Sequence, residues 1–300
     1  MVAPIETYRR ELPGGIELSC RAAGTRGRPL MMFLHGFPEA AFVWDPFLRR
    51  FAAADHGGFR CVAPNLRGVE RSSAPPDVAA YRVHELADDI LALADTEADD
   101  ATIDTLVSHD WGGAVGWAIA ARHPGRVRRL VIVNSPHPGT FARELRNSPE
   151  QRRASAYMNW LAAPGSEAAL AENDYARLFG MLAIERGAPP PVWLTDAVRQ
   201  QYRAVWARGL TGAVNLYRAT TLRPDVDCGG PELPPERFRV EVPTSVIWGM
   251  DDVALLPGLL AGLDEYVPQL TVRRVPDASH WIVHERPDLV AAEIERFRAR

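Results

Sequence analysis

Short apolar runs alternate with amphipathic stretches along most of the chain, which predicts a mainly parallel sheet with helices on both faces. The runs that fit buried strands are 30–36, 59–65, 102–110, 127–135, 244–249 and 271–276. Helical periodicity appears between some of them, at 83–98 and 112–124. Near the start, residues 5–12 and 16–23 flank the turn signal Pro13-Gly14-Gly15, which predicts a hairpin. Together these runs give a sheet of about eight strands.

The alternation stops between residues 138 and 224, where the pattern becomes helical and amphipathic and contains several aromatic residues. We interpret this segment as a helical cap inserted into an α/β core formed by residues 1–137 and 225–300. After it, residues 223–243 are rich in proline, glycine and charge and are expected to connect the cap back to the sheet at Thr244.

Composition narrows the class of protein. The chain has 300 residues, 47% of them hydrophobic and 24% charged, with a formal net charge of −4. These values are typical of a soluble globular protein, and the absence of a basic run argues against nucleic-acid or anionic-membrane partners. The first residues do not read as a signal peptide and no run of about twenty apolar residues occurs, so the cytoplasm is the expected location.

The cysteines Cys20, Cys61 and Cys228 form an odd, widely spaced set without a C-x-x-C pair. Neither a disulfide framework nor a zinc site is predicted from them, and we interpret them as ordinary thiols. No G-x-G-x-x-G follows a strand, so a dinucleotide site is not predicted either. His280, His284 and Glu285 do not fit the H-E-x-x-H zinc motif, because Trp281 stands directly after the first histidine. No cofactor is expected.

Ligands of open α/β sheets bind beyond the carboxyl ends of the strands, so polar residues at those ends are the candidates for chemistry. The residues found there are His35, Asp110, Asn134, Asp251, Asp252 and His280.

The stretch TLVSHDWGG, residues 105–113, has the pattern of a nucleophile elbow, in which a strand ends in a sharp turn that opens a helix. Ser108, Gly112 and Gly113 are the small residues that such a turn needs, and the residue at its apex is Asp110. A serine that displaced a group at a saturated carbon would become a stable ether, whereas a carboxylate becomes an ester that water can cleave. Asp110 is therefore a candidate nucleophile at saturated carbon.

With these residues the chain resembles the α/β-hydrolase superfamily, in the branch with an aspartate nucleophile: epoxide hydrolases, haloalkane dehalogenases and haloacetate dehalogenases. The resemblance extends from about Thr7 to Phe297. It rests on the elbow and on three further motifs in the expected order, HGFPE at 35–39, WGMDD at 248–252 and DASHW at 277–281.

The resemblance implies the α/β-hydrolase fold and a role for each motif residue. His280 would be the general base and Asp252 would orient it, with Asp251 as the alternative acid. The backbone N–H groups of Phe37 and Trp111 would form the oxyanion hole. Pro38 resembles the family proline that follows a tight bond, whose isomer the sequence leaves open.

The leaving group separates the two chemistries of this branch, because an opening epoxide gains from a proton donor and a departing halide does not. Tyr157 and Tyr217 stand where epoxide hydrolases carry two proton-donating cap tyrosines, although Leu216 replaces the usual tryptophan beside the second. Trp111 is shared with haloalkane dehalogenases. An epoxide hydrolase that makes a vicinal diol is therefore predicted. Haloalkane or haloacetate dehalogenation is the alternative, and a noncatalytic binder of hydrophobic ligands is a weaker one.

The expected partner is a small hydrophobic epoxide, with either a monomer or a homodimer possible. Asn134 and His137 are expected to be structural, and Glu39 and His109 to be solvated or turn residues. The residues expected to line the substrate pocket are His35, Pro38, Trp111, Phe141, Trp160, Leu161 and Trp281.

Overall fold

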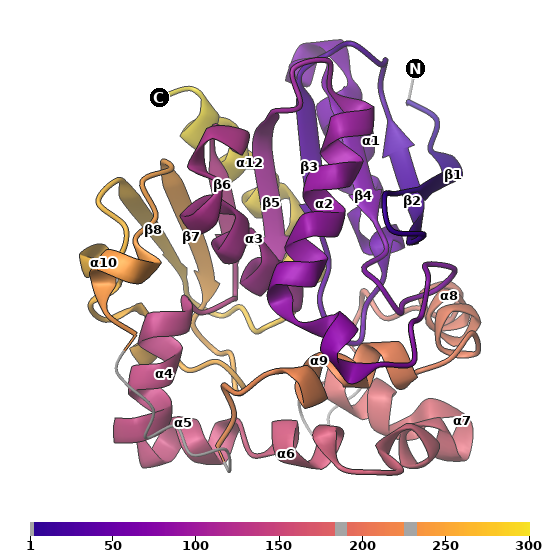
Figure 1. Ribbon diagram of the computed structural model, residues 1–300, viewed down its shortest axis with the longest axis vertical. Coiled ribbons are helices and arrows are strands. Elements are labelled where there is room, and N and C mark those ends of the chain that lie inside the picture. Colours follow the sequence, from indigo (N-terminus) through magenta and orange to yellow (C-terminus); the bar gives the residue numbers. More distant parts are fainter. Residues whose placement is uncertain (1–2, 184–190, 225–232) are drawn as a thin grey trace.

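An eight-stranded sheet lies at the centre of the structure, a computed structural model that describes residues 3–183, 191–224 and 233–300. The strand order is β1-β2-β4-β3-β5-β6-β7-β8 (Figure 1). The strands are β1 (Glu6–Glu11), β2 (Glu17–Ala23), β3 (Leu30–Leu34), β4 (Arg60–Pro64), β5 (Ile103–His109), β6 (Leu130–Val133), β7 (Thr244–Gly249) and β8 (Leu270–Val275). The pairings of β1 with β2 and of β2 with β4 are antiparallel, and all others are parallel. The predicted fold class and the N-terminal hairpin are confirmed.

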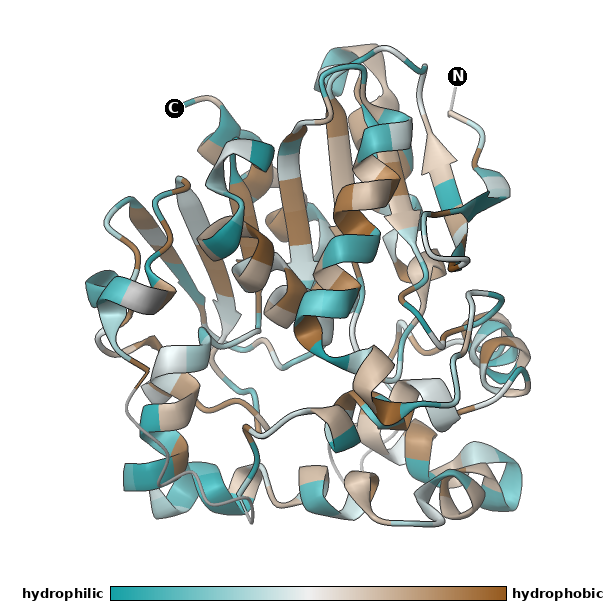
Figure 2. Ribbon diagram, viewed as in Figure 1, coloured by the Kyte–Doolittle hydropathy of each residue, from teal (hydrophilic) through white to brown (hydrophobic). Residues whose placement is uncertain are grey.

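The central strands are continuous apolar runs because both faces of a parallel sheet are covered. Every residue of β3, β4, β6 and β7 is buried, whereas the edge strand β1 alternates between exposed and half-buried positions. Figure 2 shows the same contrast, with the hydrophobic residues concentrated on the central strands and hydrophilic residues on the outer helices.

Helices cover both faces of the sheet. Helices α1 (Asp45–Ala52) and α12 (Pro287–Arg298) contact each other on one face, and α2 (Val83–Glu97) and α3 (Trp111–Arg122) pack together on the other (Figure 1). Helix α3 packs directly on β5 and β6, so its first residue lies at the carboxyl ends of the parallel strands. The short helix α11 (Ile282–Glu285) precedes α12.

In the described part of residues 138–219, six helices follow β6 and lie across the end of the sheet to which the parallel strands point (Figure 1). We call them the cap helices: α4 (Pro138–Asn147), α5 (Pro149–Ala154), α6 (Tyr157–Ala162), α7 (Ser166–Ala183), α8 (Asp196–Trp206) and α9 (Thr211–Ala219). The described part of the predicted cap contains no strand. The short helix α10 (Pro235–Phe238) leads back to β7. The predicted domain boundary at residue 225 and Cys228 both fall outside the described residues, while Cys20 and Cys61 are buried thiols.

None of the described helices is both long and apolar enough to cross a membrane.

The cap is joined to the core by backbone packing at two glycines. A Cβ atom on Gly212, in the first turn of α9, would lie 2.3 Å from the Cα of Gly68 and 2.6 Å from its carbonyl oxygen. Nearby, the indole N–H of Trp206 donates to the Pro38 carbonyl at 2.7 Å. These contacts fix the position of α9, and with it Tyr217, relative to the core.

The substitution Gly212→Ala should therefore destabilise the fold by about 1–3 kcal/mol. The new methyl group would clash with the backbone of Gly68, which can move only if the surrounding chain moves with it. Gly180→Ala is the matched control, since a Cβ on Gly180 has no neighbour within 4 Å in helix α7. This control should leave stability unchanged or raise it by up to about 1 kcal/mol. Urea unfolding of both variants measures the difference, and equal midpoints would contradict the proposed close contact.

Candidate active site

Asp110 stands at a sharp turn between the end of β5 and the start of α3, with φ 49° and ψ −120°. Such a left-handed conformation costs a non-glycine residue roughly 1–3 kcal/mol, so the surroundings must impose it. A Cβ on Gly112 would lie 2.5 Å from the Leu34 carbonyl oxygen, and one on Gly113 would lie 2.2 Å from the Cβ of Ser135. Only glycine allows the turn to pack this closely against β3 and β6.

Asp110 is held through both its side chain and its backbone. The side-chain Oδ1 accepts the backbone N–H of Phe37 at 2.7 Å, and the backbone carbonyl oxygen of Asp110 accepts the hydroxyl of Ser135 at 2.7 Å. The side chain of Asp110 is so close to the loop after β3 that a Cβ on Gly36 would lie 2.2 Å from Oδ1. Trp111 begins α3, and the structure gives no hydrogen bond from its N–H to the carboxylate.

His35 fixes the direction of the Phe37 N–H. Its Nε2 accepts the backbone N–H of Leu66 at 3.1 Å, so Nδ1 carries the hydrogen and donates to the Gly36 carbonyl at 2.8 Å. Burial lowers the pKa of His35, in agreement with a neutral ring. The carbonyl and the N–H of one trans peptide unit point in opposite directions, so holding the Gly36 carbonyl aims the Phe37 N–H at Asp110. The next bond, Phe37–Pro38, is cis.

His280 lies between two carboxylates. Its Nδ1 is 2.7 Å from Asp252 Oδ2, and its Nε2 is 3.7 Å from Asp110 Oδ2. Burial lowers the pKa of His280, but the charges of Asp252 and Asp110 and the bond to Asp252 outweigh it and raise the pKa to about 9. Asp251, the alternative acid, is exposed and makes no contact with His280 among those the described residues show.

Asp252 is itself oriented by donors. Asn134 Nδ2 donates to Oδ2 at 2.7 Å, and the backbone N–H groups of Ala254 and Leu255 donate to Oδ1 at 2.9 and 2.8 Å. Burial raises the pKa of Asp252, but the charge of His280 and these hydrogen bonds lower it overall. Asn134, which follows β6 with φ 39°, also accepts the Gly249 N–H at 2.8 Å. It therefore ties the acid to the end of the neighbouring strand.

Glu39 and His109 are buried, at 2% and 0% exposure, so the expectation that they are solvated is wrong, although the Glu39 N–H does close a turn by donating to the Gly36 carbonyl. The Glu39 carboxylate is 3.0 Å from His109 Nδ1 and 2.5 Å from His284 Nε2, and it accepts the Tyr202 hydroxyl at 3.2 Å. These partners come from the end of β5, from α11 and from α8, so only the folded chain brings them together.

His109 Nε2 is 2.9 Å from the carbonyl oxygen of His280, the residue expected to act as base. Both partners of the ring are acceptors, so His109 joins the Glu39 carboxylate to the backbone of His280. The pKa of Glu39 would be raised by burial, yet the charges and hydrogen bonds of His284 and His109 hold it well below its usual range.

Asp110 opens into a cavity of about 570 Å³ between the core and the cap helices. Tyr157 on α6 and Tyr217 on α9 line it together with Asp110 and Trp111. The Tyr217 ring is edge-on to the rings of Trp111 and Phe37, each at 5.1 Å, and lies 6.1 Å from the Tyr157 ring. The rest of the lining is mainly apolar and includes Trp117, Phe141, Met158 and Leu255.

The pKa values of both cavity tyrosines are raised. Burial is the main cause for each, and the negative charge of Asp110 adds to it. Both phenols therefore keep their hydrogens at neutral pH and can donate them.

Of the residues expected to line the pocket, Trp111 and Phe141 do so and five do not. His35 lies under the loop that it orients, Pro38 accepts the Trp206 indole, and the Trp281 indole donates to the Met181 carbonyl at 3.1 Å. On α6, Trp160 is 37% exposed and Leu161 is fully buried within the cap, because Tyr157 and Met158 occupy the face toward the cavity.

Comparison with known proteins supports the fold described above. Residues 29–287 match the family model described as alpha/beta hydrolase fold. The chain is 34% identical to the AB hydrolase superfamily protein YfhM of Bacillus subtilis, over 92% of each chain. It is 31% identical to human epoxide hydrolase 4, over 97% of this chain and 78% of that protein.

A solved structure of an epoxide hydrolase from Bacillus megaterium, in complex with an inhibitor, superposes with a TM-score of 0.85 at 30% identity. The alignment covers 98% of this chain and all of the other, 100%. The chain belongs to the alpha/beta hydrolase family, in the branch that contains epoxide hydrolases.

Proposed function

We propose that the protein hydrolyses an epoxide to a vicinal diol through an ester between Asp110 and the substrate. The observation that carries the proposal is the content of the cavity: a carboxylate held in a strained turn and two protonated phenols share one mainly apolar space. Asp110 is the only acid among the described lining residues. The epoxide hydrolases among the relatives support the same substrate class.

In the first step, an oxygen of Asp110 attacks an epoxide carbon, and the bond between that carbon and the epoxide oxygen breaks. Oδ2 is the attacking atom, because Oδ1 is engaged by the Phe37 N–H. Tyr157 or Tyr217 gives a proton to the departing oxygen, which becomes the first hydroxyl of the diol.

In the second step, His280 removes a proton from water, and the resulting hydroxide attacks the Asp110 carbonyl carbon. The Phe37 N–H stabilises the oxyanion. As the ester bond breaks, the departing oxygen takes the remaining proton of the water from the Asp110 carboxyl and becomes the second hydroxyl, which restores the carboxylate, while the proton held by His280 replaces the one that the tyrosine gave. One water is consumed overall. With a pKa of about 9, His280 is protonated in the free enzyme at neutral pH. Esterification removes the Asp110 charge, which is one cause of that high value, so the first step lowers the pKa of His280 and lets the ring release its proton to solvent before it takes one from the attacking water.

The phenols favour an epoxide over a halide. A departing halide is already a stable anion and needs no proton, so two buried phenols beside the nucleophile would have no chemical task in dehalogenation. Assaying styrene oxide beside a bromoalkane separates the two functions by diol formation or bromide release.

Replacing His280 with glutamine should stop the cycle at the ester, because the amide cannot accept the proton from water. Incubation with styrene oxide should then add the mass of one substrate to the intact protein. Asp110→Asn is the control and should acquire no mass, since a neutral amide is a poor nucleophile. A folded His280→Gln protein that stays unmodified, beside an active wild type, would contradict the ester mechanism.

Tyr157→Phe and Tyr217→Phe should each slow ester formation, by about 100-fold for loss of a general acid, and the double variant should be slower still. Single-turnover measurements with excess enzyme give this rate directly. Tyr81→Phe is a suitable control, because Tyr81 is as buried as Tyr217 but donates to the Pro75 carbonyl outside the cavity. Ester formation at the wild-type rate in the double variant would exclude the phenols as proton donors.

We further propose that Glu39 is a positioning residue for His280. It holds the His109 ring, whose Nε2 donates to the carbonyl of His280, and it binds the cap through Tyr202. The carboxylate of Glu39 thus links the base to the cap without touching the substrate.

Glu39→Gln should lower the free energy of unfolding at pH 7 by about 3 kcal/mol, because it leaves buried imidazole groups without their counter-charge. The pKa of Glu39 is lower in the folded protein than in the unfolded chain. The stabilisation is therefore fully present above the pKa that Glu39 has in the unfolded chain, and it is lost as the pH falls below that value. The deficit should therefore shrink below about pH 4.3. Urea unfolding at several pH values measures it.

Tyr202→Phe is the matched control. It removes one hydrogen bond to the same carboxylate and should cost about 1 kcal/mol. That deficit should not vary with pH, because the charge of Glu39 is retained. A Glu39→Gln deficit that stays constant between pH 7 and pH 3 would refute the charge argument.

A further inference from the structure

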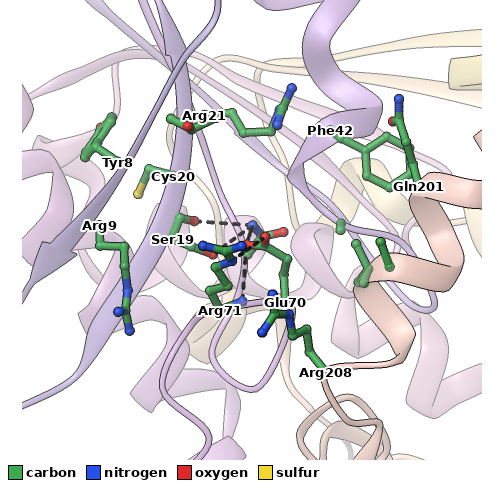
Figure 3. A pocket seen from close by; sticks show the side chains of 15 residues that line it. Tyr8, Arg9, Ser19, Cys20, Arg21, Phe42, Glu70, Arg71, Gln201 and Arg208 are labelled. Carbon is green, nitrogen blue, oxygen red and sulfur yellow. Dashed lines mark hydrogen bonds and ion pairs between the residues drawn. The ribbon is translucent and has the colours of Figure 1, made fainter.

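A second cavity of about 570 Å³ lies between the core and the cap, and none of its lining residues lines the catalytic cavity. One wall is formed by the core, from β1, β2 and the loops after β3 and β4. The other wall is formed by α8 and the residues that follow it, with Gln201, Val205 and Arg208 (Figure 3). The cavity has no part in the reaction proposed above.

The charged residues of this cavity are mostly cations. Among the described residues that line it there are four arginines, Arg9, Arg21, Arg71 and Arg208, and a single acid, Glu70. Two of them are neutralised nearby: Arg21 makes two bonds to Asp45, at 2.7 and 2.6 Å, and Arg9 pairs with Glu17.

Glu70 does not satisfy the remaining arginines. Its Oε2 accepts the Ser19 hydroxyl at 2.6 Å and the Asn65 amide at 3.1 Å. The Arg71 guanidinium forms an ion pair with Glu70 at 3.6 Å, a distance too long for a hydrogen bond, so its N–H donors are not used by Glu70. In the parts of the chain that the structure describes, no acceptor bonds the guanidinium of Arg208.

Both of these arginines stand on fixed supports. Glu70 adopts φ 54°, a strained conformation for a non-glycine residue, which the bonds of its side chain to Ser19 and Asn65 hold in place. Arg71 follows directly, and its own N–H donates to Glu70 Oε2 at 3.1 Å. Arg208 comes two residues after Trp206, whose indole is bound to the Pro38 carbonyl. Figure 3 shows Arg71, Glu70 and Arg208 grouped at one side of the cavity, with Phe42 and Gln201 beyond them.

We propose that this cavity binds a small organic oxyanion, a phosphate ester or a carboxylate, between Arg71 of the core and Arg208 of the cap. A guanidinium presents several N–H donors in one plane, which suits the oxygens of such a group. Phe42 and Val205 provide apolar surface for the organic part. The cavity volume is that of a small-molecule site, which favours a small ligand over a protein partner. A ligand held in this way joins the cap to the core.

Calorimetric titration of the whole protein with phenyl phosphate, benzoate and inorganic phosphate tests the proposal. At least one organic probe should bind saturably and raise the melting temperature, because it binds only the folded state. Raising the ionic strength should weaken the binding, since the arginines are exposed to solvent. The higher affinity of the two organic probes, phenyl phosphate or benzoate, shows which oxyanion the cavity prefers. If an organic probe binds more tightly than inorganic phosphate, the apolar surface contributes to the affinity.

Arg71→Gln and Arg208→Gln should each weaken binding by about tenfold or more, the usual effect of losing a charge-assisted hydrogen bond. Arg274→Gln is the matched control: it makes the same charge change at an exposed position on β8, at the opposite edge of the sheet from β1, and should leave binding unchanged. Absence of saturable binding for all three probes would overturn the proposal. So would equal binding by Arg71→Gln, Arg208→Gln and the wild type.

Discussion

The placement of one carboxylate, that of Asp110, governs the rest of the site. The turn that carries it is strained, with φ 49°, and it is tolerated because three neighbours fit only this arrangement. Gly36 and Gly112 leave no room for a side chain, and Ser135, in the segment just after β6, donates its hydroxyl to the Asp110 carbonyl. The side chain consequently projects beyond the end of the sheet with one oxygen bound to the Phe37 N–H and the other facing His280. Strain of this kind is stable only in a packed interior, so the fold and the nucleophile depend on each other.

Buried histidines around this carboxylate differ in charge, although their side chains are chemically the same. His35 and His137 are desolvated without a nearby carboxylate bond, so burial dominates and lowers the pKa of each, for His137 to about 4. Both accept a backbone N–H, which requires a neutral ring. His280 is equally buried, but its carboxylate neighbours raise its pKa to about 9. A histidine that accepts a backbone N–H stays neutral and orients the backbone, whereas a histidine bound to a carboxylate can carry a proton. The nearest hydrogen-bond partner therefore decides the role of each ring.

Sequence reasoning works for this chain where function is encoded locally. The elbow is such a case, since a buried strand, an apex residue and glycines within a few positions specify a sharp turn whatever lies around it. The order and spacing of the motifs likewise placed Asp252 and His280 at strand ends, and parallel strands bring such ends together. The same reasoning failed for Glu39 and His109, because charged residues are usually exposed and burial of this pair depends on partners from α8 and α11, far away in the sequence. No pattern marks Ser135 as the partner of Asp110.

The pocket residues show a different limit. Helix α6 has six residues, too few for periodicity to define which side is buried, so Trp160 and Leu161 were assigned to the cavity that Tyr157 and Met158 occupy. The phase of such a helix is set by its packing, here by the position of the cap as a whole. The contact of Gly212 with Gly68 fixes that position at one end, and Trp206 on Pro38 fixes it nearby. The core thus determines where the nucleophile lies, while the interface between core and cap determines how far the two phenols stand from it. Changes at that interface can alter substrate selection while leaving Asp110, His280 and Asp252 in place.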